Sequence, residues 1–317
     1  MGLLGLGVLF LTELRCLFNT FRGRRALFKY FRFDEWSIRN LRENTLYLNH
    51  HSFFNDPFEC RCEIRTGFPK LGDGSSRFAD VLRAWGFEKA DDEVALENYD
   101  EYMTSLEGAE PDIEYYIDSA RITCFSRRPD NLLMWAHYGD GLRGFCIEFD
   151  EGRILDSQES ANLYEVLYAE TPSVVDASVM AVLHDQWYYN NDAFFETETL
   201  SKCSGSDKGF ELSLYESGIK DAHDQIQQLY QKMLATKPIA WSYEEELRLI
   251  DCSQREDSLG ITLPYPVSAI KSVVFGEKIS SDHEQAIVEI VSKMSASIEL
   301  KRAVRVTGSF DIHISAF

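Results

Sequence analysis

Three carboxylates and a guanidinium lie within residues 241–250, Trp-Ser-Tyr-Glu-Glu-Glu-Leu-Arg-Leu-Ile, a segment whose composition otherwise indicates a β-strand. Because residues two apart on a strand point to the same face, Glu244, Glu246 and Arg248 are expected on one side of it. Three charges on one face need either water at the lip of a cleft or a site where a carboxylate acts on a substrate. The pattern alone is more often a solvated face with cross-strand ion pairs, so its surroundings decide between the two.

Strands from both ends of the chain are interleaved with single helices, which predicts an α+β fold with a mixed, mostly antiparallel central sheet. The segments with strand patterns are Leu27–Arg32, Thr45–Asn49, Arg121–Ser126, Arg143–Phe149, residues 241–250, Ser272–Phe275, Ile298–Arg305 and Phe310–Ile314. With 317 residues, 44% of them hydrophobic, the chain can bury one large core. We therefore expect a single domain over residues 27–317, preceded by an apolar, amphipathic extension at residues 1–26.

Two helical insertions are expected within this domain, at about residues 68–118 and 170–236. More broadly, the pattern over residues 156–235 is mainly helical. Nearer the predicted sheet, Asp34 is a suitable N-cap for a helix that runs to Arg42. A further short helix is expected over residues 131–138. The prediction is thus a sheet domain decorated by helices.

The chain has 52 acidic and 32 basic residues and a net charge of −20, which disfavours stable binding to nucleic acid. A small nucleotide-like ligand needs only a local cationic pocket and is compatible with this charge. The apolar N-terminal stretch is about a dozen residues long, whereas a helix that spans a bilayer needs roughly 20. No integral membrane association is therefore expected.

Seven cysteines without a C-x-x-C pair indicate reduced thiols in a cytoplasmic protein. Cys60 and Cys62 follow His50 and His51 closely in sequence. However, the two-residue spacer and the second ligand pair of a zinc site are missing. The sequence therefore predicts no structural zinc site, and no residue is assigned as a metal ligand from these cysteines and histidines.

Four sequence blocks occur in an order that resembles a known family. They are Phe54-Asn-Asp-Pro-Phe-Glu59, Cys124-Phe-Ser126, Met134-Trp-Ala-His-Tyr138 with the following Gly144–Phe149, and Trp241-x-x-Glu-x-Glu-x-Arg248. With these blocks in this order, the chain is similar, from about Phe28 to about Gly276, to the bacterial family called domain of unknown function 2971. That name implies no chemistry. Asn55 and Asp56 are expected on a loop, because the following proline keeps Asp56 out of the helical region.

The order of the blocks is also similar to that of ADP-ribosyltransferases, which combine an anchoring polar residue, a strand ending in Ser or Thr, a helical Tyr and a late Glu-x-Glu strand. When these family positions are assigned to the present sequence, Lys29 takes the place of the Arg or His anchor. Ser126 takes the place of the residue that ends the middle strand. Tyr138 takes the place of the Tyr that stacks on nicotinamide, and Glu246 that of the Glu that orients the ribose. The resemblance implies a split central sheet, NAD as substrate, a protein or nucleic-acid acceptor, and a role as a toxin or phage-defence effector. It requires these four residues to converge on one cleft.

In this interpretation Glu246 is the candidate catalytic carboxylate, because cleaving the bond between nicotinamide and ribose develops positive charge on the ribose carbon. Glu244 would position the acceptor, and Tyr138 completes the catalytic candidates. A pyrophosphate needs cationic donors. The candidates for binding the pyrophosphate of NAD are Lys29 and Arg32, and those for binding the nicotinamide are Trp135 or Tyr138. Arg248 would hold the two carboxylates or a phosphate. Ser126 and the turn at Asn55 and Asp56 complete the candidates for binding NAD.

Two other functions fit the same sequence. A metal-dependent hydrolase or nuclease would bind Mg²⁺ or Mn²⁺ through an oxygen-rich cluster and activate water, with the ligands Asp56, Glu59, Glu148, Glu244 and Glu246. A non-enzymatic sensor or interaction protein would bind a nucleotide-like ligand in the same cleft without turnover. These alternatives are open at the level of the sequence.

Overall fold

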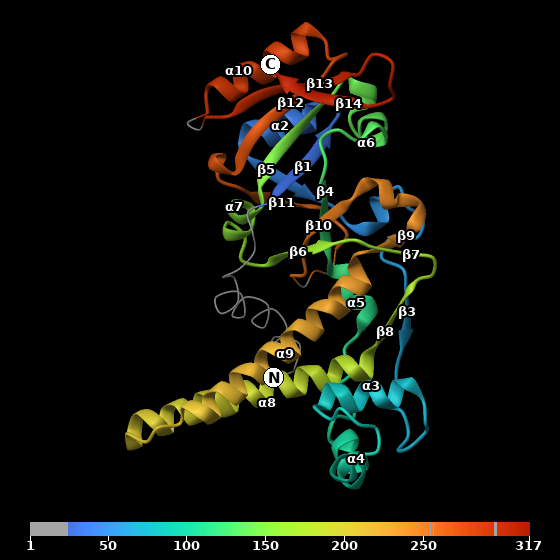
Figure 1. Cartoon of the computed structure of the whole chain (residues 1–317), viewed down its shortest axis with the longest axis vertical. Helices are drawn as coiled ribbons and strands as arrows, with labels where there is room; N and C mark the ends of the chain where they lie inside the picture. The colour runs from blue at the N-terminus through green and yellow to red at the C-terminus, as the bar shows by residue number, and fades with distance from the viewer. Residues whose placement is uncertain (1–24, 254, 256, 295–296) are drawn as a thin grey trace. The chain divides into compact units, whose positions relative to one another are not determined.

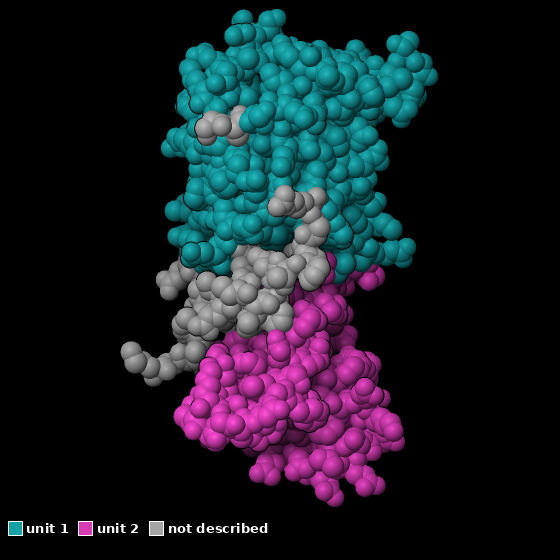
Figure 2. Space-filling model, turned by 60° about the vertical axis from the view of Figure 1, so that its left-hand side comes forward, with its two compact units in different colours: residues 1–59, 116–170, 237–317 teal, residues 60–115, 171–236 magenta. Residues whose placement is uncertain are grey.

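A computed structural model of the chain describes residues 25–253, 255, 257–294 and 297–317. The chain divides into two compact units, each built from separate stretches of sequence (Figure 1, Figure 2). Unit 1 comprises residues 1–59, 116–170 and 237–317, and unit 2 comprises residues 60–115 and 171–236. Unit 2 thus takes up most of the two ranges expected as insertions. The expected extension at residues 1–26 lies outside the described residues except for its last two.

An eight-stranded sheet forms the centre of unit 1. Its strand order is β14-β13-β12-β5-β1-β4-β10-β6, and neighbours are antiparallel except β12 and β13, which run parallel. The strands are β1 (Ala26–Phe31), β4 (Arg121–Ser126), β5 (Phe145–Asp150), β6 (Ala161–Glu165), β10 (Glu246–Asp251), β12 (Ile270–Gly276), β13 (Glu299–Arg305) and β14 (Ile312–Ala316). The α+β fold and the mixed, mostly antiparallel sheet expected from the sequence are therefore confirmed.

The ladder of this sheet is interrupted between two central strands, β1 and β4. These strands share one register position, Phe28 opposite Ser126, whereas β1 pairs with β5 along its whole length. On its other edge β4 pairs with β10 throughout, from Glu246 opposite Ser126 to Asp251 opposite Arg121. Ser126 is thus the point at which β1, β4 and β10 meet, and the ladder between β1 and β4 does not continue past it.

Alternating side chains give the sheet two apolar faces. On β5, Phe145 belongs to the larger buried cluster, which helices α2 and α10 cover, and its neighbour Cys146 belongs to a smaller cluster on the opposite face. Trp135 of α6 packs in the smaller cluster. The helices of unit 1 are α2 (Glu35–Glu43), α5 (Ile113–Ser119, which begins in unit 2), α6 (Leu132–His137), α7 (Glu151–Asp156) and α10 (Ser281–Ser292).

Helix α2 begins and ends at residues suited to cap it. The side chain of Asp34 accepts a hydrogen bond of 2.8 Å from the backbone N–H of Ser37, and the Ser37 hydroxyl accepts one of 3.1 Å from the N–H of Asp34. Asn44 ends the helix in the left-handed conformation, with φ of 53°. The expected N-cap is therefore confirmed, and it fixes where the chain leaves β1.

Short elements complete unit 1. They are β2 (Thr45–Leu48) paired with β11 (Ile261–Pro264), β7 (Leu167–Ala169) paired with β9 (Thr236–Pro238), and the 3₁₀ helices η2 (His51–Phe53), η3 (Asp140–Leu142), η4 (Ile239–Glu244) and η5 (Val267–Ala269). The expectation of mainly helical structure over residues 156–235 is confirmed for Ala177–Ser204 and Gly209–Leu234, but it is wrong at its start, where β6, β7 and β8 (Ser173–Asp176) lie. In β6 the buried Ala161 and Leu163 alternate with the less buried Asn162, and this two-residue period is too short to stand out beside the long helical pattern that follows.

Two long helices dominate unit 2. Helices α8 (Ala177–Ser204) and α9 (Gly209–Leu234) pack side by side, and α3 (Ser76–Trp85) packs against α8 (Figure 1). Helix α4 (Glu93–Ser105) and the parallel pair β3 (Cys62–Arg65) and β8 (Ser173–Asp176) complete the unit. Within the described part of the chain, no helix is both long and apolar enough to cross a membrane.

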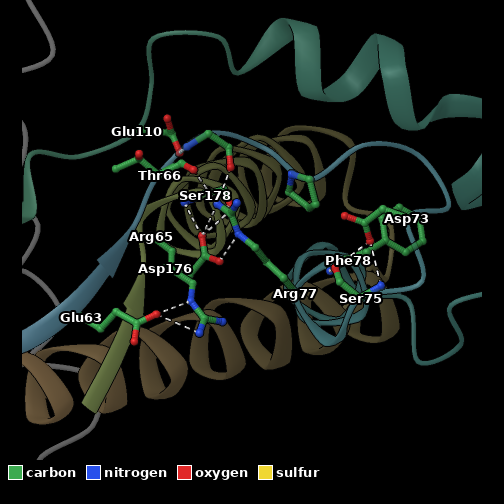
Figure 3. Close-up of polar contacts among 12 residues, drawn as sticks. Glu63, Arg65, Thr66, Asp73, Ser75, Arg77, Phe78, Glu110, Asp176 and Ser178 are labelled. Atoms are coloured by element: carbon green, nitrogen blue, oxygen red, sulfur yellow. Dashed lines mark hydrogen bonds and ion pairs between the residues drawn. The ribbon is translucent and has the colours of Figure 1, made fainter. Parts of the chain in front are cut away.

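A partly buried guanidinium ties the ends of several unit 2 elements together (Figure 3). Arg77 on α3 donates hydrogen bonds of 2.5 and 3.0 Å to the two carboxylate oxygens of Asp176, which is also the N-cap of α8. The same guanidinium donates to the backbone carbonyl of Thr66 at 3.0 Å, one residue beyond β3. One side chain therefore links the starts of α3 and α8 to the end of β3.

Candidate functional site

A cavity of about 430 Å³ lies in unit 1, lined by residues of both β1 and β4. Its walls include most of the side chains that the sequence analysis brought together: Lys29, Arg32, Asn55, Ser126, Tyr138, Glu244 and Glu246. These residues come from β1, the loop after η2, β4, the end of α6, η4 and β10. The cavity therefore gathers segments that are far apart in the sequence around the point where β1 and β4 cease to pair.

A lysine ammonium holds two carboxylates of the cavity wall together. Lys237 Nζ lies 2.5 Å from Glu244 Oε2 and 2.9 Å from Glu246 Oε2, and the three side chains are almost fully buried. The ammonium also lies 4.8 Å from the centre of the Trp241 ring, a cation–π contact. Glu246 Oε1 accepts a hydrogen bond of 2.9 Å from Arg248 Nε. The alternative of a solvated strand face is therefore wrong, because these charges are paired inside the protein.

These neighbours shift the pKa values of the two carboxyl groups in opposite directions. Burial alone would raise the pKa of Glu246, but Arg248 and Lys237 outweigh it and lower that pKa to about 2. For Glu244 burial dominates and the charge of Glu246 adds to it, so its pKa is raised despite Lys237. Burial opposes the charge of Lys237 as well, but the two carboxylates outweigh this effect and raise the pKa of the lysine. Pairs of carboxyl groups with separated pKa values are common where one group acts as a base and the other as an acid.

Glu244 is not on the strand, contrary to the expectation from alternation. It ends the 3₁₀ helix η4, Glu245 adopts a left-handed conformation with φ of 43°, and β10 begins at Glu246. The chain turns here because the backbone carbonyl of Glu244 accepts a hydrogen bond of 2.7 Å from Ser126 Oγ, and that of Glu245 accepts one of 3.0 Å from Arg127 N. The two glutamates reach the same lysine from different elements, so their proximity does not come from a shared strand face.

Lys29 extends from β1 to β4. Its ammonium donates hydrogen bonds to Thr123 Oγ1 at 2.8 Å and to the backbone carbonyl of Cys124 at 2.9 Å. Burial lowers the pKa of Lys29, although Cys124 and Glu246 oppose this shift. An ammonium has three donors, and the contacts among the described residues use two of them, so one N–H can serve a ligand oxygen.

Tyr138 links the carboxylate pair to the aromatic side of the cavity. Its hydroxyl donates a hydrogen bond of 2.6 Å to Glu244 Oε1 and accepts one of 3.4 Å from the Asn55 amide. Burial and the bond to Glu244 raise the pKa of Tyr138, so the phenol stays protonated at neutral pH. At the cavity, Tyr47 and Phe53 expose 46% and 66% of their surfaces. Exposed aromatic rings are surfaces on which a heteroaromatic base can stack.

Trp135 and Asp56, two of the predicted ligand-binding residues, are buried. The indole N–H of Trp135 donates a hydrogen bond of 2.7 Å to the carbonyl of Pro129, and the ring is fully enclosed in the core. Asp56 Oδ1 accepts a hydrogen bond of 2.9 Å from the N–H of Phe58, which stabilises the turn before it. Neither side chain lines the cavity among the described residues, so Trp135 offers no surface for a nicotinamide ring.

Arg248 and Arg32 differ in their exposure to solvent. Arg248 is fully buried, where it pairs with Glu59 as well as with Glu246, so it supports the carboxylate wall rather than the cavity surface. Burial raises the pKa of Glu59 although Arg248 opposes this. Arg32 lines the cavity with a side chain that is 74% exposed, and lies 3.9 Å from Asp34. Arg32 is thus accessible to a ligand, and Arg248 is not.

Lys237 and Thr123 are functional candidates that the sequence pattern did not single out. Lys237 is an isolated charge in the apolar run Leu-Ala-Thr-Lys-Pro-Ile-Ala-Trp, residues 234–241. Because lysine is rarely buried unless it is paired, an isolated lysine in such a run is the signal that indicates a buried ion pair. Thr123 gives no comparable signal, since threonine is common in strands for reasons of packing alone.

His50, His51 and Asp118 are the group of described residues whose ligand atoms lie close enough together to hold a metal ion. His50 Nδ1 lies 2.7 Å from Ser52 Oγ and 3.2 Å from Ser52 N, and the ring also bonds to the backbone of Asp118. His51 Nε2 lies 3.3 Å from Asp118 Oδ1, an ordinary hydrogen bond. A metal-binding histidine needs an unprotonated nitrogen that points at the metal. This cluster is therefore better explained as a hydrogen-bonded turn.

Residues 134–249 match the model of a family described as protein of unknown function, DUF2971. Over these residues the chain is similar to the DUF2971 family. The resemblance inferred from the sequence blocks is thus confirmed. The matched range runs from α6 to β10, so the DUF2971 segment includes Tyr138, Lys237, Glu244 and Glu246, whereas Lys29 precedes it. No curated protein and no solved structure matches the chain.

Proposed function

We propose that this protein is an NAD-cleaving enzyme that acts as an ADP-ribosyltransferase or as an NAD glycohydrolase. The observation that carries the proposal is the convergence of Lys29, Ser126, Tyr138 and Glu246 on one cavity. These are the four residues that the similarity to ADP-ribosyltransferases requires to meet. Three of them lie on β1, β4 and β10, which are consecutive strands of the sheet.

Glu246 supplies the negative charge that this reaction needs. Breaking the bond between nicotinamide and ribose leaves the electron pair on the nicotinamide nitrogen and positive charge on the ribose carbon. A fixed carboxylate in a buried site stabilises such charge more strongly than a carboxylate in water does. With a pKa of about 2, Glu246 is ionised at neutral pH. Each carboxylate oxygen accepts more than one hydrogen bond, so Glu246 can bind a ribose hydroxyl while it keeps Lys237 and Arg248.

The charge and the aromatic surface of the cavity suit a dinucleotide. The whole chain carries a net charge of −20, yet the cavity presents the cationic side chains of Lys29 and Arg32, whereas the charge of Lys237 is paired with Glu244 and Glu246. Pyrophosphate oxygens accept hydrogen bonds from such donors. Tyr47 and Phe53 provide exposed rings, and stacking of a base on an aromatic ring contributes about 1–3 kcal/mol. The ligand expected here therefore combines a diphosphate with at least one aromatic base.

The same residues fit a metal-dependent hydrolase less well. Glu244 and Glu246 both bind Lys237, whose ammonium lies where a bridging divalent cation would be needed. Glu148 pairs with Lys301 at 2.9 Å. Divalent cations require several carboxylate oxygens directed at one point. In the described part of the chain, these acidic side chains are directed at lysines instead.

Release of nicotinamide from NAD by the purified protein tests the proposal. It is measured with and without cell lysate, which supplies acceptors. The Glu246→Gln variant is expected to lose about 100-fold or more of the rate, with its fold checked by circular dichroism. Glu245→Gln is the matched control, because Glu245 pairs with Arg128 at 3.6 Å and does not line the cavity.

Release that depends on lysate would identify transfer, and release without lysate would identify hydrolysis. Absence of release by the wild-type protein under both conditions would contradict the proposal. Binding of NAD without release, measured by calorimetry, would favour the ligand-sensor alternative. Equal rates for the Glu246→Gln and Glu245→Gln variants would show that Glu246 is not the catalytic carboxylate.

A further inference from the structure

Lys237 contacts both carboxylates of the cavity wall but belongs to neither of their elements. It comes from β9, whereas Glu244 ends η4 and Glu246 begins β10. We propose, on the basis of the NAD-cleaving function above, that Lys237 is a positioning residue, which keeps the Glu244–Glu246 pair ionised and holds Glu246 in a fixed orientation.

The orientation follows from the donors around Glu246. Lys237 binds Oε2 at 2.9 Å and Arg248 Nε binds Oε1 at 2.9 Å, so each carboxylate oxygen has its own cationic donor. The backbone N–H of Glu246 donates to the Tyr168 hydroxyl at 2.8 Å, which fixes the start of the strand. A carboxylate held at both oxygens cannot rotate about its terminal bond without losing charge-assisted hydrogen bonds, which are the strong ones. Removal of Lys237 would release one of these two oxygens.

The ionisation follows from the charge balance of the cluster. The other titratable groups that face Glu246 are Lys29 of β1, Glu59 of the loop before β3, Cys124 of β4, Tyr168 of β7, Glu244 of η4, and Arg248 of β10 itself. Without Lys237, the carboxylates of Glu244 and Glu246 would be buried side by side with no cation between them. Two buried carboxylates this close cannot both stay ionised near neutral pH, so the pair would take up a proton.

Comparing a neutral with a charged replacement of Lys237 distinguishes an effect of its charge from an effect of its packing. Lys237→Gln keeps a hydrogen-bond donor but removes the charge, whereas Lys237→Arg keeps the charge. The pH dependence of nicotinamide release is expected to shift in the Gln variant, with its acidic limb moved up by about one pH unit or more and its rate at neutral pH lowered about 10-fold or more. The Arg variant is expected to keep the acidic limb of the wild type. Lys237→Met serves as a second neutral variant if the Gln variant is not folded.

Infrared absorption of protonated carboxyl groups gives a second reading that needs no turnover. The neutral variant is expected to show a protonated carboxyl band at neutral pH that the wild-type and Arg variants lack. Unchanged pH dependence and no new band in the neutral variant would overturn the inference, even if its rate falls. If the wild-type protein releases no nicotinamide, the proposed function fails, and the infrared titration alone decides whether Lys237 sets the ionisation of the pair.

Discussion

The hydroxyl of Ser126 donates a hydrogen bond of 2.7 Å to the backbone carbonyl of Glu244. Ser126 is also the position at which β1 and β4 pair, and it lies opposite Glu246 in the ladder of β4 and β10. One small side chain at a strand end therefore contacts the turn that directs two glutamates from different elements to one lysine. The carboxylate pair depends on this local geometry.

Replacing Lys29 by methionine is expected to weaken NAD binding and to stabilise the fold. Burial lowers the pKa of Lys29, so the folded state holds the ammonium less readily than the unfolded state, and the charge costs stability below its usual pKa. We expect Lys29→Met to lower NAD affinity about 10-fold or more and to raise the free energy of unfolding. Calorimetric titration with NAD and unfolding in urea at pH 7 measure the two effects. Unchanged affinity would exclude Lys29 from the ligand site.

Replacing Arg248 by methionine is expected to destabilise unit 1 strongly. Its guanidinium is fully buried between Glu246 and Glu59, and both carboxylates would lose this cation. Removing one partner of a buried ion pair typically costs about 3–5 kcal/mol, which unfolding in urea can measure. The matched control is Arg128→Met, because Arg128 is 52% exposed and pairs with Asp130 at 2.9 Å, an arrangement worth less than about 1 kcal/mol. Equal losses in the two variants would contradict the assigned burial of the cluster.

Strand composition and block order are sufficient to place several site residues on their strands. Lys29, Ser126 and Glu246 lie on β1, β4 and β10, and the strand pattern around each of them is local and regular. The α+β fold follows from the same patterns. What makes these three residues neighbours is the order of strands in the sheet, which strand periodicity alone does not contain.

The rest of the site depends on contacts that are distant in the sequence. The turn at Glu245 interrupts the alternation because the carbonyl of Glu244 is bonded to Ser126, a residue more than a hundred positions earlier. Lys237 has no pattern of its own, and its role appears only when η4 and β10 bring two carboxylates to it. β1 and β4 pair at a single position, next to the cavity, and this is likewise a feature of the assembled sheet.

Replacing Arg77 by alanine is expected to loosen the start of α8 in unit 2 (Figure 3). The variant would lose both bonds to Asp176, the N-cap of that helix, and the bond to the carbonyl of Thr66. We expect a loss of about 2 kcal/mol in local stability, read as faster hydrogen exchange over the first turns of α8. Arg83→Ala is the control on the same helix, because Arg83 is 61% exposed and pairs with Asp80 at 2.8 Å. Equal exchange rates in the two variants would show that the Arg77 network does not stabilise the helix start.

Glu246 is expected to make the stability of unit 1 depend on pH in the acid range. Its pKa is lowered from 4.5 to about 2 by Arg248 and Lys237, against the effect of burial. A lowered carboxyl pKa stabilises the folded state above the unfolded pKa, and this contribution is lost as the pH falls towards the folded pKa. The shift corresponds to roughly 3 kcal/mol, of which about 2 are expected to be lost by pH 3.

Unfolding in urea between pH 7 and pH 3, compared for the wild-type protein and the Glu246→Gln variant, measures this contribution. The variant cannot titrate at this position, so its free energy of unfolding is expected to fall less over the same range. The difference between the two curves should be nearly constant above pH 5 and should shrink below it, because only the ionised glutamate gains from Arg248 and Lys237. A difference that stays constant down to pH 3 would show that the pKa of Glu246 is not lowered, and that Arg248 and Lys237 do not outweigh its burial.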